Sequence, residues 1–312
     1  MPPLPQRHAR LDGLAMALLT VLCLTWGLQQ IAVKVAAIGI SPVLQAGIRS
    51  IGAGLLLWLW SAFRGIALFE RDGSLVPGLV LGIVFAAEVV VLFWGLSVTT
   101  ASRAVVVLYT APFFVAIGAH LLLPDERLRP INFVGLVCAF TGIAVAFADG
   151  LAGQGGGSLL GDLAVLSSAV GWAATTLIVK ATGLIRVSPN KTLFYQLAVS
   201  GVSLPLVSWI MGEPGFTDPT PLMLACLAYQ VILVAFVSYL AWFWLMIRYP
   251  AAKLAAFTFV TPLFGLIAGG ILLNERITPA LVAALALVAI GIQLVNRRGK
   301  PAPTKVIGAV DA

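Results

Sequence analysis

One pattern of residues occurs twice in this chain, and the duplication restricts its fold more than any other feature. A Trp is followed by a basic residue and then by a Pro at steps of nine residues, and a later Glu precedes a Gly by sixteen. The first copy runs through Trp94, Arg103, Pro112, Glu126 and Gly142, and the second through Trp244, Lys253, Pro262, Glu275 and Gly291. This set of equal spacings indicates a duplicated unit of roughly 150 residues.

The composition places the chain in a membrane. Of its 312 residues, 60% are hydrophobic and 10% are charged, whereas a soluble domain has about 25% charged residues. Apolar stretches close to the ~20 residues that a helix needs to cross a bilayer lie at 14–36, 42–63, 75–98, 101–123, 130–149, 159–181, 190–211, 222–247, 252–273 and 279–296. We therefore expect an all-α membrane protein with ten transmembrane helices.

The expected helices fall into two groups of five on either side of a Gly-rich stretch. We expect a first five-helix repeat at 12–149, a linker at 150–158, a second repeat at 159–298 and a cytoplasmic tail at 299–312. Because five is odd, the second repeat enters the membrane from the opposite side, so the two repeats are inverted around a central cavity. Most of the 19 basic residues fall in segments on the same side of the expected membrane as the N-terminus. The positive-inside rule then predicts that both termini are cytoplasmic.

The first and sixth expected helices carry the same stripe of side chains. Trp26, Gln30 and Lys34 follow one another at four-residue intervals, as do Trp172, Thr176 and Lys180. Each stripe therefore lies on one helix face and predicts two related walls of the cavity. Four basic residues are expected at the cavity mouths: Lys34, Arg103, Lys180 and Lys253. The alternative for the two lysines of the stripes is that they extend to lipid head groups.

Glu88 is the acidic residue that lies well inside an expected span. A charged side chain at a helix centre costs about 2.5–3.5 kcal/mol, so it usually faces a cavity or a partner. Either Glu88 pairs with Arg49 and fixes helix packing, or it lines the cavity and meets a substrate cation or a proton. In the second case Leu92 shares its face, and the repeat relates the two residues to Ser238 and Trp242.

The fourth and ninth expected helices each contain a proline near mid-membrane, Pro112 and Pro262. Proline removes a helical hydrogen bond, so each site is either a simple kink or a hinge. We favour hinges that open one mouth of the cavity while they close the other. Tyr109 and Phe259, three residues before each proline, are further candidates for the cavity wall.

Other features have structural interpretations. Glu126 and Glu275 follow the ends of spans, where local pairing or capping is expected. Small residues in the fifth helix predict a close packing face, either internal or between two copies: Gly135, Ala139, Gly142 and Ala146.

Nothing in the sequence calls for a metal or a cofactor. The three cysteines lie in separate spans without metal-ligand spacing, and the chain has only two histidines. The basic residues are dispersed singly through short loops, so no nucleic-acid partner is expected. We expect a small-molecule substrate and the lipid bilayer as partners, with a monomer sufficient for transport and a homodimer as the alternative.

Several of these features together resemble a known family. They are the tandem five-helix halves, Trp26-Gly27 in the first helix, the two mid-membrane prolines, and a Glu followed by a Pro-started helix with a later Gly-Ile. Over about 12–298 the chain resembles the EamA-type branch of the drug/metabolite transporter superfamily, and within it the bacterial aromatic amino-acid exporters. The resemblance implies an alternating-access carrier in the bacterial inner membrane, with helices one, three, four, six, eight and nine around the cavity.

The candidate residues favour an amphipathic cargo. Aromatic side chains offer flat apolar surface, and amide, hydroxyl and carboxylate groups offer hydrogen bonds to a polar head. Export of aromatic or other neutral amino acids fits this combination best. The alternatives are a proton-coupled drug exporter using Glu88, a carrier of phosphorylated sugars or nucleotide sugars, and, more remotely, a passive channel or an intramembrane enzyme. No HExxH, GxSxG or paired intramembrane aspartates occur, so we expect no enzyme.

Overall fold

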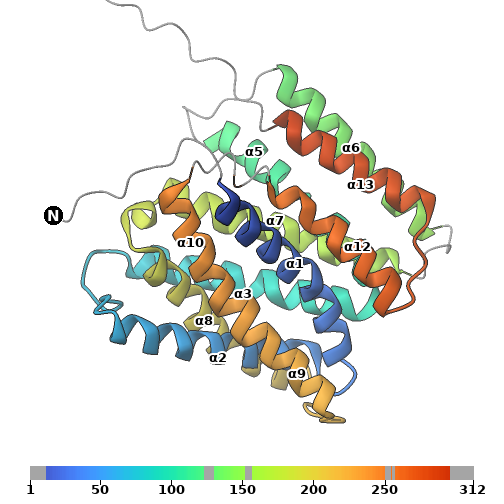
Figure 1. Cartoon of the computed structure of the whole chain (residues 1–312). Helices are drawn as coiled ribbons and strands as arrows, with labels where there is room; N and C mark the ends of the chain where they lie inside the picture. Colours follow the sequence, from blue (N-terminus) through green and yellow to red (C-terminus); the bar gives the residue numbers. More distant parts are fainter. Residues whose placement is uncertain (1–11, 123–129, 152–156, 250–253, 255–256, 296–312) are drawn as a thin grey trace, which may run out of the picture.

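The computed structural model of the chain describes residues 12–122, 130–151, 157–249, 254 and 257–295. Within these ranges the chain is a bundle of helices (Figure 1). Its main elements are α1 (Gly13–Ala36), α2 (Pro42–Phe63), α3 (Leu75–Val98), α4 (Ala101–Leu108), α5 (Ala111–Leu122), α6 (Pro130–Leu151), α7 (Leu159–Ala181), α8 (Pro189–Ile210), α9 (Pro221–Tyr229), η2 (Gln230–Val237), α10 (Ser238–Arg248), η3 (Thr258–Val260), α12 (Thr261–Leu272) and α13 (Pro279–Val295).

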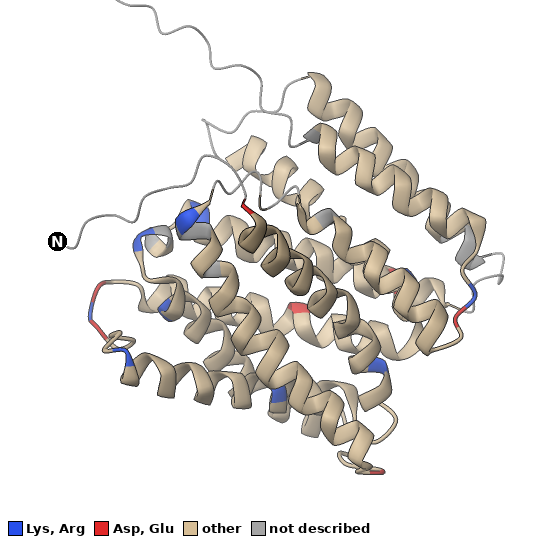
Figure 2. Ribbon diagram, in the orientation of Figure 1, with Lys and Arg blue, Asp and Glu red and all other residues tan. Residues whose placement is uncertain are grey.

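The helices have the length and apolarity of membrane spans. Among the described residues, seven helical stretches are long and apolar enough to cross a bilayer, and three shorter apolar helices lie at Pro130–Ala146, Thr261–Leu272 and Pro279–Leu294. The charged residues coloured in Figure 2 lie mostly at helix ends and in connecting loops. The predicted all-helical membrane class is confirmed, while the start of the expected span 252–273 lies outside the described residues.

The helix that contains Pro112 is broken rather than kinked. α4 ends at Leu108 and α5 begins at Ala111, which makes Pro112 the second residue of a new helix. A proline at this position has no helical N–H to lose. Thr110 closes the break, since its backbone N–H and its hydroxyl both donate to the carbonyl of Val107, at 3.1 and 2.6 Å. The break is consistent with the expectation that Pro112 removes a helical hydrogen bond, since Pro112 has no N–H to donate to the carbonyl of Leu108, where α4 ends.

The second half contains a comparable irregularity before Pro262. A short 3-10 turn, η3, precedes α12, and Pro262 is again the second residue of its helix. The preceding span is irregular too, because its middle section, η2, is a π-helix that begins at Gln230. Such wide turns are frequent at functional sites. The regular α-helical hydrogen-bond pattern is therefore interrupted at three places: the α4–α5 break, η2 and η3.

The packing of the helices defines the interior. α6 and α13 lie side by side along one edge of the bundle, and α2 packs against α8 near the opposite edge (Figure 1). Between these pairs, α3 packs against α7 and α8, α1 against α12 and α9, and α4 against α12 and α7. The residues of the candidate site come from this middle group and from α2, η2 and α10, which pack against it.

The small residues of α6 form an internal packing face. A Cβ added to Gly142 would lie 2.9 Å from the carbonyl oxygen of Ala284, and one added to Gly291 would lie 2.6 Å from that of Gly135. The two backbones therefore approach each other more closely than larger side chains would permit. Of the two expectations for this stripe, the internal one is realised.

Candidate functional site

The first part of the site joins α1 to α10. The indole Nε1 of Trp26 donates a 2.8 Å hydrogen bond to the hydroxyl of Ser238. The Trp26 ring also meets Trp242 edge-on, with centroids 5.5 Å apart and planes at 71°. Ser238 in turn donates to the carbonyl of Val234, within the π-helix. This network orients an aromatic pair and a hydroxyl together at the junction of η2 and α10.

A second aromatic pair joins the break in the α4–α5 span to α7. Tyr109 and Trp172 meet edge-on at a centroid distance of 6.0 Å and an angle of 87°. Tyr109 is buried at the end of α4, whereas Trp172 remains 39% exposed. One turn further along α7, the hydroxyl of Thr176 donates to the carbonyl of Trp172 at 3.0 Å. The repeat relates Trp172 to Trp26, so each half supplies one tryptophan to such a pair.

Glu88 lies in the middle of α3, against α7. A Cβ added to Gly171 would lie 2.9 Å from the Cβ of Glu88, so only a glycine at this position leaves room for the carboxylate's stem. The carboxylate oxygen Oε2 is buried and has no hydrogen-bond partner. Its neighbour Leu92 is 5% exposed and belongs to the apolar core shared with Val165 of α7. Glu88 is thus a half-buried acidic residue, with one buried and unpartnered oxygen, beside an apolar core.

Arg49 of α2 approaches the same interface. It is 7% exposed, and its guanidinium carbon lies 5.1 Å from the centroid of the Phe93 ring. Tyr239 and Glu88 both interact with it electrostatically. Within the described part of the chain, however, no ion pair joins Arg49 to Glu88, and the Nε of Arg49 has no acceptor. The alternative in which these two residues form a direct packing pair is therefore not realised.

Three buried glutamines lie in or against the C-terminal part of α1. The Nε2 of Gln45 donates to the carbonyl of Val33 at 3.3 Å, and that of Gln230 donates to the carbonyl of Ala32 at 3.4 Å. Gln30 itself is 2% exposed. In all three amides the Oε1 oxygen is buried without a donor. Buried polar atoms are normally satisfied, so this cluster offers acceptors to a ligand or to water.

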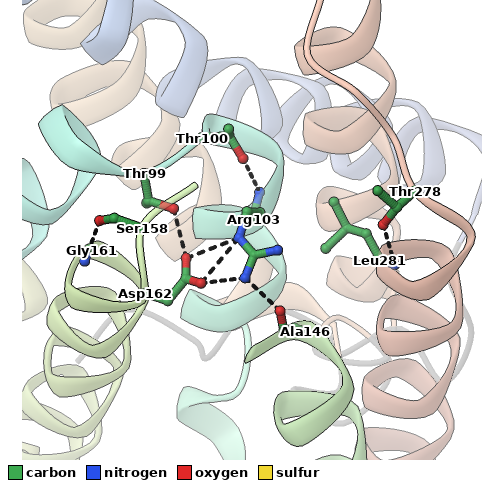
Figure 3. Close-up of polar contacts among 9 residues, drawn as sticks. All are labelled: Thr99, Thr100, Arg103, Ala146, Ser158, Gly161, Asp162, Thr278 and Leu281. Carbon is green, nitrogen blue, oxygen red and sulfur yellow. Dashed lines mark hydrogen bonds and ion pairs between the residues drawn. The ribbon is translucent and has the colours of Figure 1, made fainter. Parts of the chain in front are cut away.

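One end of the bundle is closed by a buried ion pair. Arg103 of α4 is fully buried and pairs with Asp162 in the first turn of α7 (Figure 3). Its Nε lies 3.1 and 3.3 Å from the two carboxylate oxygens, and its Nη2 also donates to the carbonyl of Ala146. The hydroxyl of Thr99 donates to the same carboxylate at 2.7 Å. This network connects α3, α4, α6 and α7.

Glu275 strengthens the same end. Its two carboxylate oxygens accept the backbone N–H groups of Ala101 and Ser102, both at 2.8 Å. These groups belong to the first turn of α4, where a negative charge is stabilised by the helix dipole. Lys34 of α1 donates to the carbonyl of Thr99 next to it. Its sequence position suggested that Glu275 caps the helix that follows it. Instead, Glu275 caps α4, a helix of the other half of the chain.

The opposite end has a related contact. The hydroxyl of Tyr249, just after α10, donates to the carboxylate of Asp12 at 2.7 Å. Asp12 also accepts the N–H of Ala15 at 2.8 Å and so caps α1. The repeat relates Tyr249 to Thr99. At each end, a residue after the third span of one half thus bonds to an aspartate at the start of the first span of the other half.

Comparison with known proteins gives the family. The model of the EamA-like transporter family matches the chain twice, at residues 13–148 and 159–297. The chain belongs to the EamA-like transporter family. It is therefore a transporter and an integral membrane protein, in agreement with the helices described above.

Individual relatives of this EamA protein agree with that placement. The uncharacterized transporter YvbV of Bacillus subtilis (strain 168) is 31% identical over 298 residues, which span 93% of this chain and 94% of the relative. A probable amino-acid metabolite efflux pump of Escherichia coli (strain K12) is 25% identical over 298 residues, spanning 92% and 95%. The family and these relatives are named as transporters, which argues against an enzyme.

A solved structure shares the fold of this EamA protein. It superimposes with a TM-score of 0.64 at 18% identity and covers 91% of this chain and 96% of the other. Similarity at this level of identity concerns the fold alone. It supports the helical architecture of Figure 1.

The structure brings part of the predicted site together. The predicted residues Trp26, Ser238 and Trp242 are in contact, as are Tyr109 and Trp172. Gln30 and Glu88 each have a buried unpartnered oxygen. That these residues line a transport cavity stays a prediction. Lys253 and the side chain of Phe259 lie outside what the structure describes, and Lys180 lies partly exposed in the last turn of α7.

Some residues have a different place from the one expected. Arg103 is buried against Asp162 and does not sit at an open mouth, because the carboxylate compensates its charge inside the bundle. Leu92 packs in the core. Sequence reasoning missed Asp162, Gln45 and Gln230, although a polar residue inside an apolar span was a signal that could have identified all three.

Removing the carboxylate of Glu275 should weaken the start of α4. Loss of a helix-capping acceptor costs typically about 1 kcal/mol, so we expect Glu275→Ala to lower the free energy of unfolding by roughly this amount. Glu275→Gln keeps one acceptor oxygen and should lose less. Thermal denaturation in detergent measures both, with Glu70→Ala in an exposed loop as the matched control. Equal stability of Glu275→Ala and the control would contradict the capping role.

Proposed function

We propose that this EamA-family protein is an alternating-access secondary transporter that exports aromatic or other neutral amino acids across the bacterial inner membrane. The observation that carries the proposal is the combination of a half-buried carboxylate, Glu88, whose Oε2 has no hydrogen-bond partner, with two edge-on aromatic pairs in the same bundle. Such a site offers flat apolar surface to a side chain and a charge to a polar head. Relatives in Escherichia coli and Salmonella typhimurium are named probable amino-acid metabolite efflux pumps, which supports the choice of cargo.

The packing of the helices supports two inverted five-helix repeats, 12–149 and 159–298. If each element is replaced by its equivalent in the other half, the contact of α1 with α12 becomes that of α7 with α5, and the contact of α3 with α8 becomes that of η2 with α2. All four contacts are present in the structure. The contact of α6 with α13 is its own equivalent. The two matches to the family model fall on the same halves. In this proposal the halves have five spans each and enter the membrane from opposite sides. The positive-inside rule, applied to the basic loops, supports a cytoplasmic location for both termini.

Alternating access requires the carrier to populate an outward-open and an inward-open form. The breaks before Pro112 and Pro262 supply places where half of a span can tilt without loss of regular helical bonds. The contacts at the outer end of the bundle would break when those at the inner end form, and the reverse. Arg103–Asp162 and Glu275 serve the outer end in this scheme, and Asp12–Tyr249 serves the inner one.

A second candidate is a proton-coupled exporter of cationic drugs. The buried carboxylate of Glu88 favours it, because one acidic group can exchange a proton for an organic cation. The two candidates differ in cargo, since a cationic drug needs no carboxylate of its own. An assay that compares transport of amino acids with transport of cationic drugs therefore distinguishes the two candidates.

Counterflow into proteoliposomes tests the proposal. Proteoliposomes that contain the purified protein are loaded with one unlabelled compound, and the same compound in labelled form is added outside. The four compounds are phenylalanine, leucine, glucose 6-phosphate and tetraphenylphosphonium. We expect saturable exchange of the two amino acids above that of protein-free liposomes. Exchange confined to tetraphenylphosphonium would replace the proposal with the drug exporter, and exchange confined to the sugar phosphate would overturn both. No exchange of any of the four would contradict amino-acid transport.

A further inference from the structure

Among the residues that the structure describes, two arginines are buried, Arg49 and Arg103, and their surroundings differ. Arg103 has the carboxylate of Asp162 and the carbonyl of Ala146 as acceptors. Arg49 is 7% exposed, yet it has a ring face beside it and an Nε without an acceptor. A buried charge that lacks a hydrogen-bonded partner is strongly unfavourable. An arginine kept in that state suggests that its acceptor arrives with a ligand.

An opposite charge in a similar state lies nearby. The Oε2 of Glu88 is buried without a donor, and Glu88 and Arg49 interact electrostatically without forming an ion pair. Glu88 precedes Phe93, the ring beside the guanidinium, by five residues of α3. At a rise of 1.5 Å per residue, this spacing corresponds to about 7.5 Å along the axis of α3. Arg49 and Glu88 thus lie near the same stretch of α3 without forming an ion pair.

Two opposite charges that lie near the same stretch of a helix without bonding to each other suit one chemical class. Charge-assisted hydrogen bonds are about 2.8 Å long, and the ammonium and carboxylate of an α-amino acid are attached to the same carbon. One such zwitterion would bridge the two side chains with both of its charges paired. A singly charged ligand would leave either Arg49 or Glu88 without a partner.

We propose that Arg49 and Glu88 form a zwitterion site, in which Arg49 binds the carboxylate and Glu88 binds the ammonium of one α-amino acid. The planar guanidinium suits bidentate recognition of a carboxylate. Tyr239, which interacts with Arg49, follows Ser238 in the chain. The substrate side chain would therefore extend toward Ser238, Trp26 and Trp242. This inference rests on the proposed function, because it assigns the polar half of the same substrate.

Competition in the counterflow assay tests the site in the wild-type protein. Three analogues of phenylalanine each lack one charge: its methyl ester and phenethylamine lack the carboxylate, and 3-phenylpropionate lacks the ammonium. Since each analogue loses one charge-assisted hydrogen bond to the protein, we expect it to compete at least tenfold more weakly than phenylalanine. An ester that competes as well as phenylalanine would overturn the role of Arg49 while leaving amino-acid transport intact. Absence of phenylalanine exchange would instead be a failure of the proposed function, and the zwitterion site would fall with it.

Variants then assign each charge to its residue. Arg49→Gln should lose the preference for phenylalanine over phenethylamine, and Glu88→Gln should lose the preference for phenylalanine over 3-phenylpropionate. Arg49→Lys keeps the charge without the planar fork and should retain part of its preference, which also guards against a failure of Arg49→Gln to fold. Arg64→Gln, at the exposed end of α2, is the matched control. Unchanged preferences in folded Arg49 variants would contradict the site.

Discussion

Replacement of Asp162 by asparagine should destabilise the protein by about 3–5 kcal/mol, because removal of one partner leaves a buried charge uncompensated. Arg103 and Asp162 are both almost completely inaccessible, with 1% and 0% of their side chains exposed. The carboxylate also accepts from Thr99, so its loss affects three spans at once. Arg103→Gln should be destabilising to a similar degree. Thermal denaturation in detergent, followed by loss of monodisperse protein, provides the measurement.

The paired apolar replacement distinguishes a charge effect from simple loss of packing. Arg103→Met combined with Asp162→Leu leaves no buried charge, and such exchanges are often neutral or stabilising. We expect the double variant to recover most of the stability that either single variant loses. Glu70→Gln is the control, since Glu70 lies exposed in the loop before α3 and its replacement should leave the stability nearly unchanged. A double variant as unstable as Asp162→Asn would show that shape, and not charge, governs this contact.

Replacement of Glu88 by glutamine should lower the rate of amino-acid exchange at least tenfold. The amide is nearly the same size but carries no charge, so it loses the charge-assisted hydrogen bond to an ammonium, which contributes about 1.5–3 kcal/mol. The fold should be unaffected or stabilised, because a buried neutral group costs less than a buried charge. Stability and transport therefore move in opposite directions, as expected for a functional residue.

The measurement is the initial rate of phenylalanine counterflow at several pH values, at equal amounts of reconstituted protein. Glu88→Asp retains the charge on a shorter side chain and should keep part of the activity. Glu70→Gln changes an exposed acidic residue in the loop before α3 and should leave the rate unchanged. Exchange by Glu88→Gln at the wild-type rate at every pH would remove Glu88 from the substrate site.

The difference in residue number between equivalent positions of the two halves indicated which residues have related contacts. The repeat related Glu88 and Leu92 to Ser238 and Trp242, and Ser238 and Trp242 both meet Trp26. The same offset related Thr99 to Tyr249, which make related hydrogen bonds at opposite ends of the bundle. Equivalent positions in a duplicated unit share a helix face, so spacing alone predicts which residues are in comparable environments.

The amino-acid sequence by itself determined the helical membrane class, the approximate spans and the family, because apolar length and residue spacing are local properties that can be read along the chain. Only the tertiary structure decided which polar groups meet. Asp162 pairs with Arg103 from another span, Glu275 caps α4 across the two halves, and Arg49 stays separate from Glu88. These outcomes depend on how each helix is rotated and where it crosses its neighbours. Rotation and crossing are set by packing among many distant side chains, which no local pattern specifies.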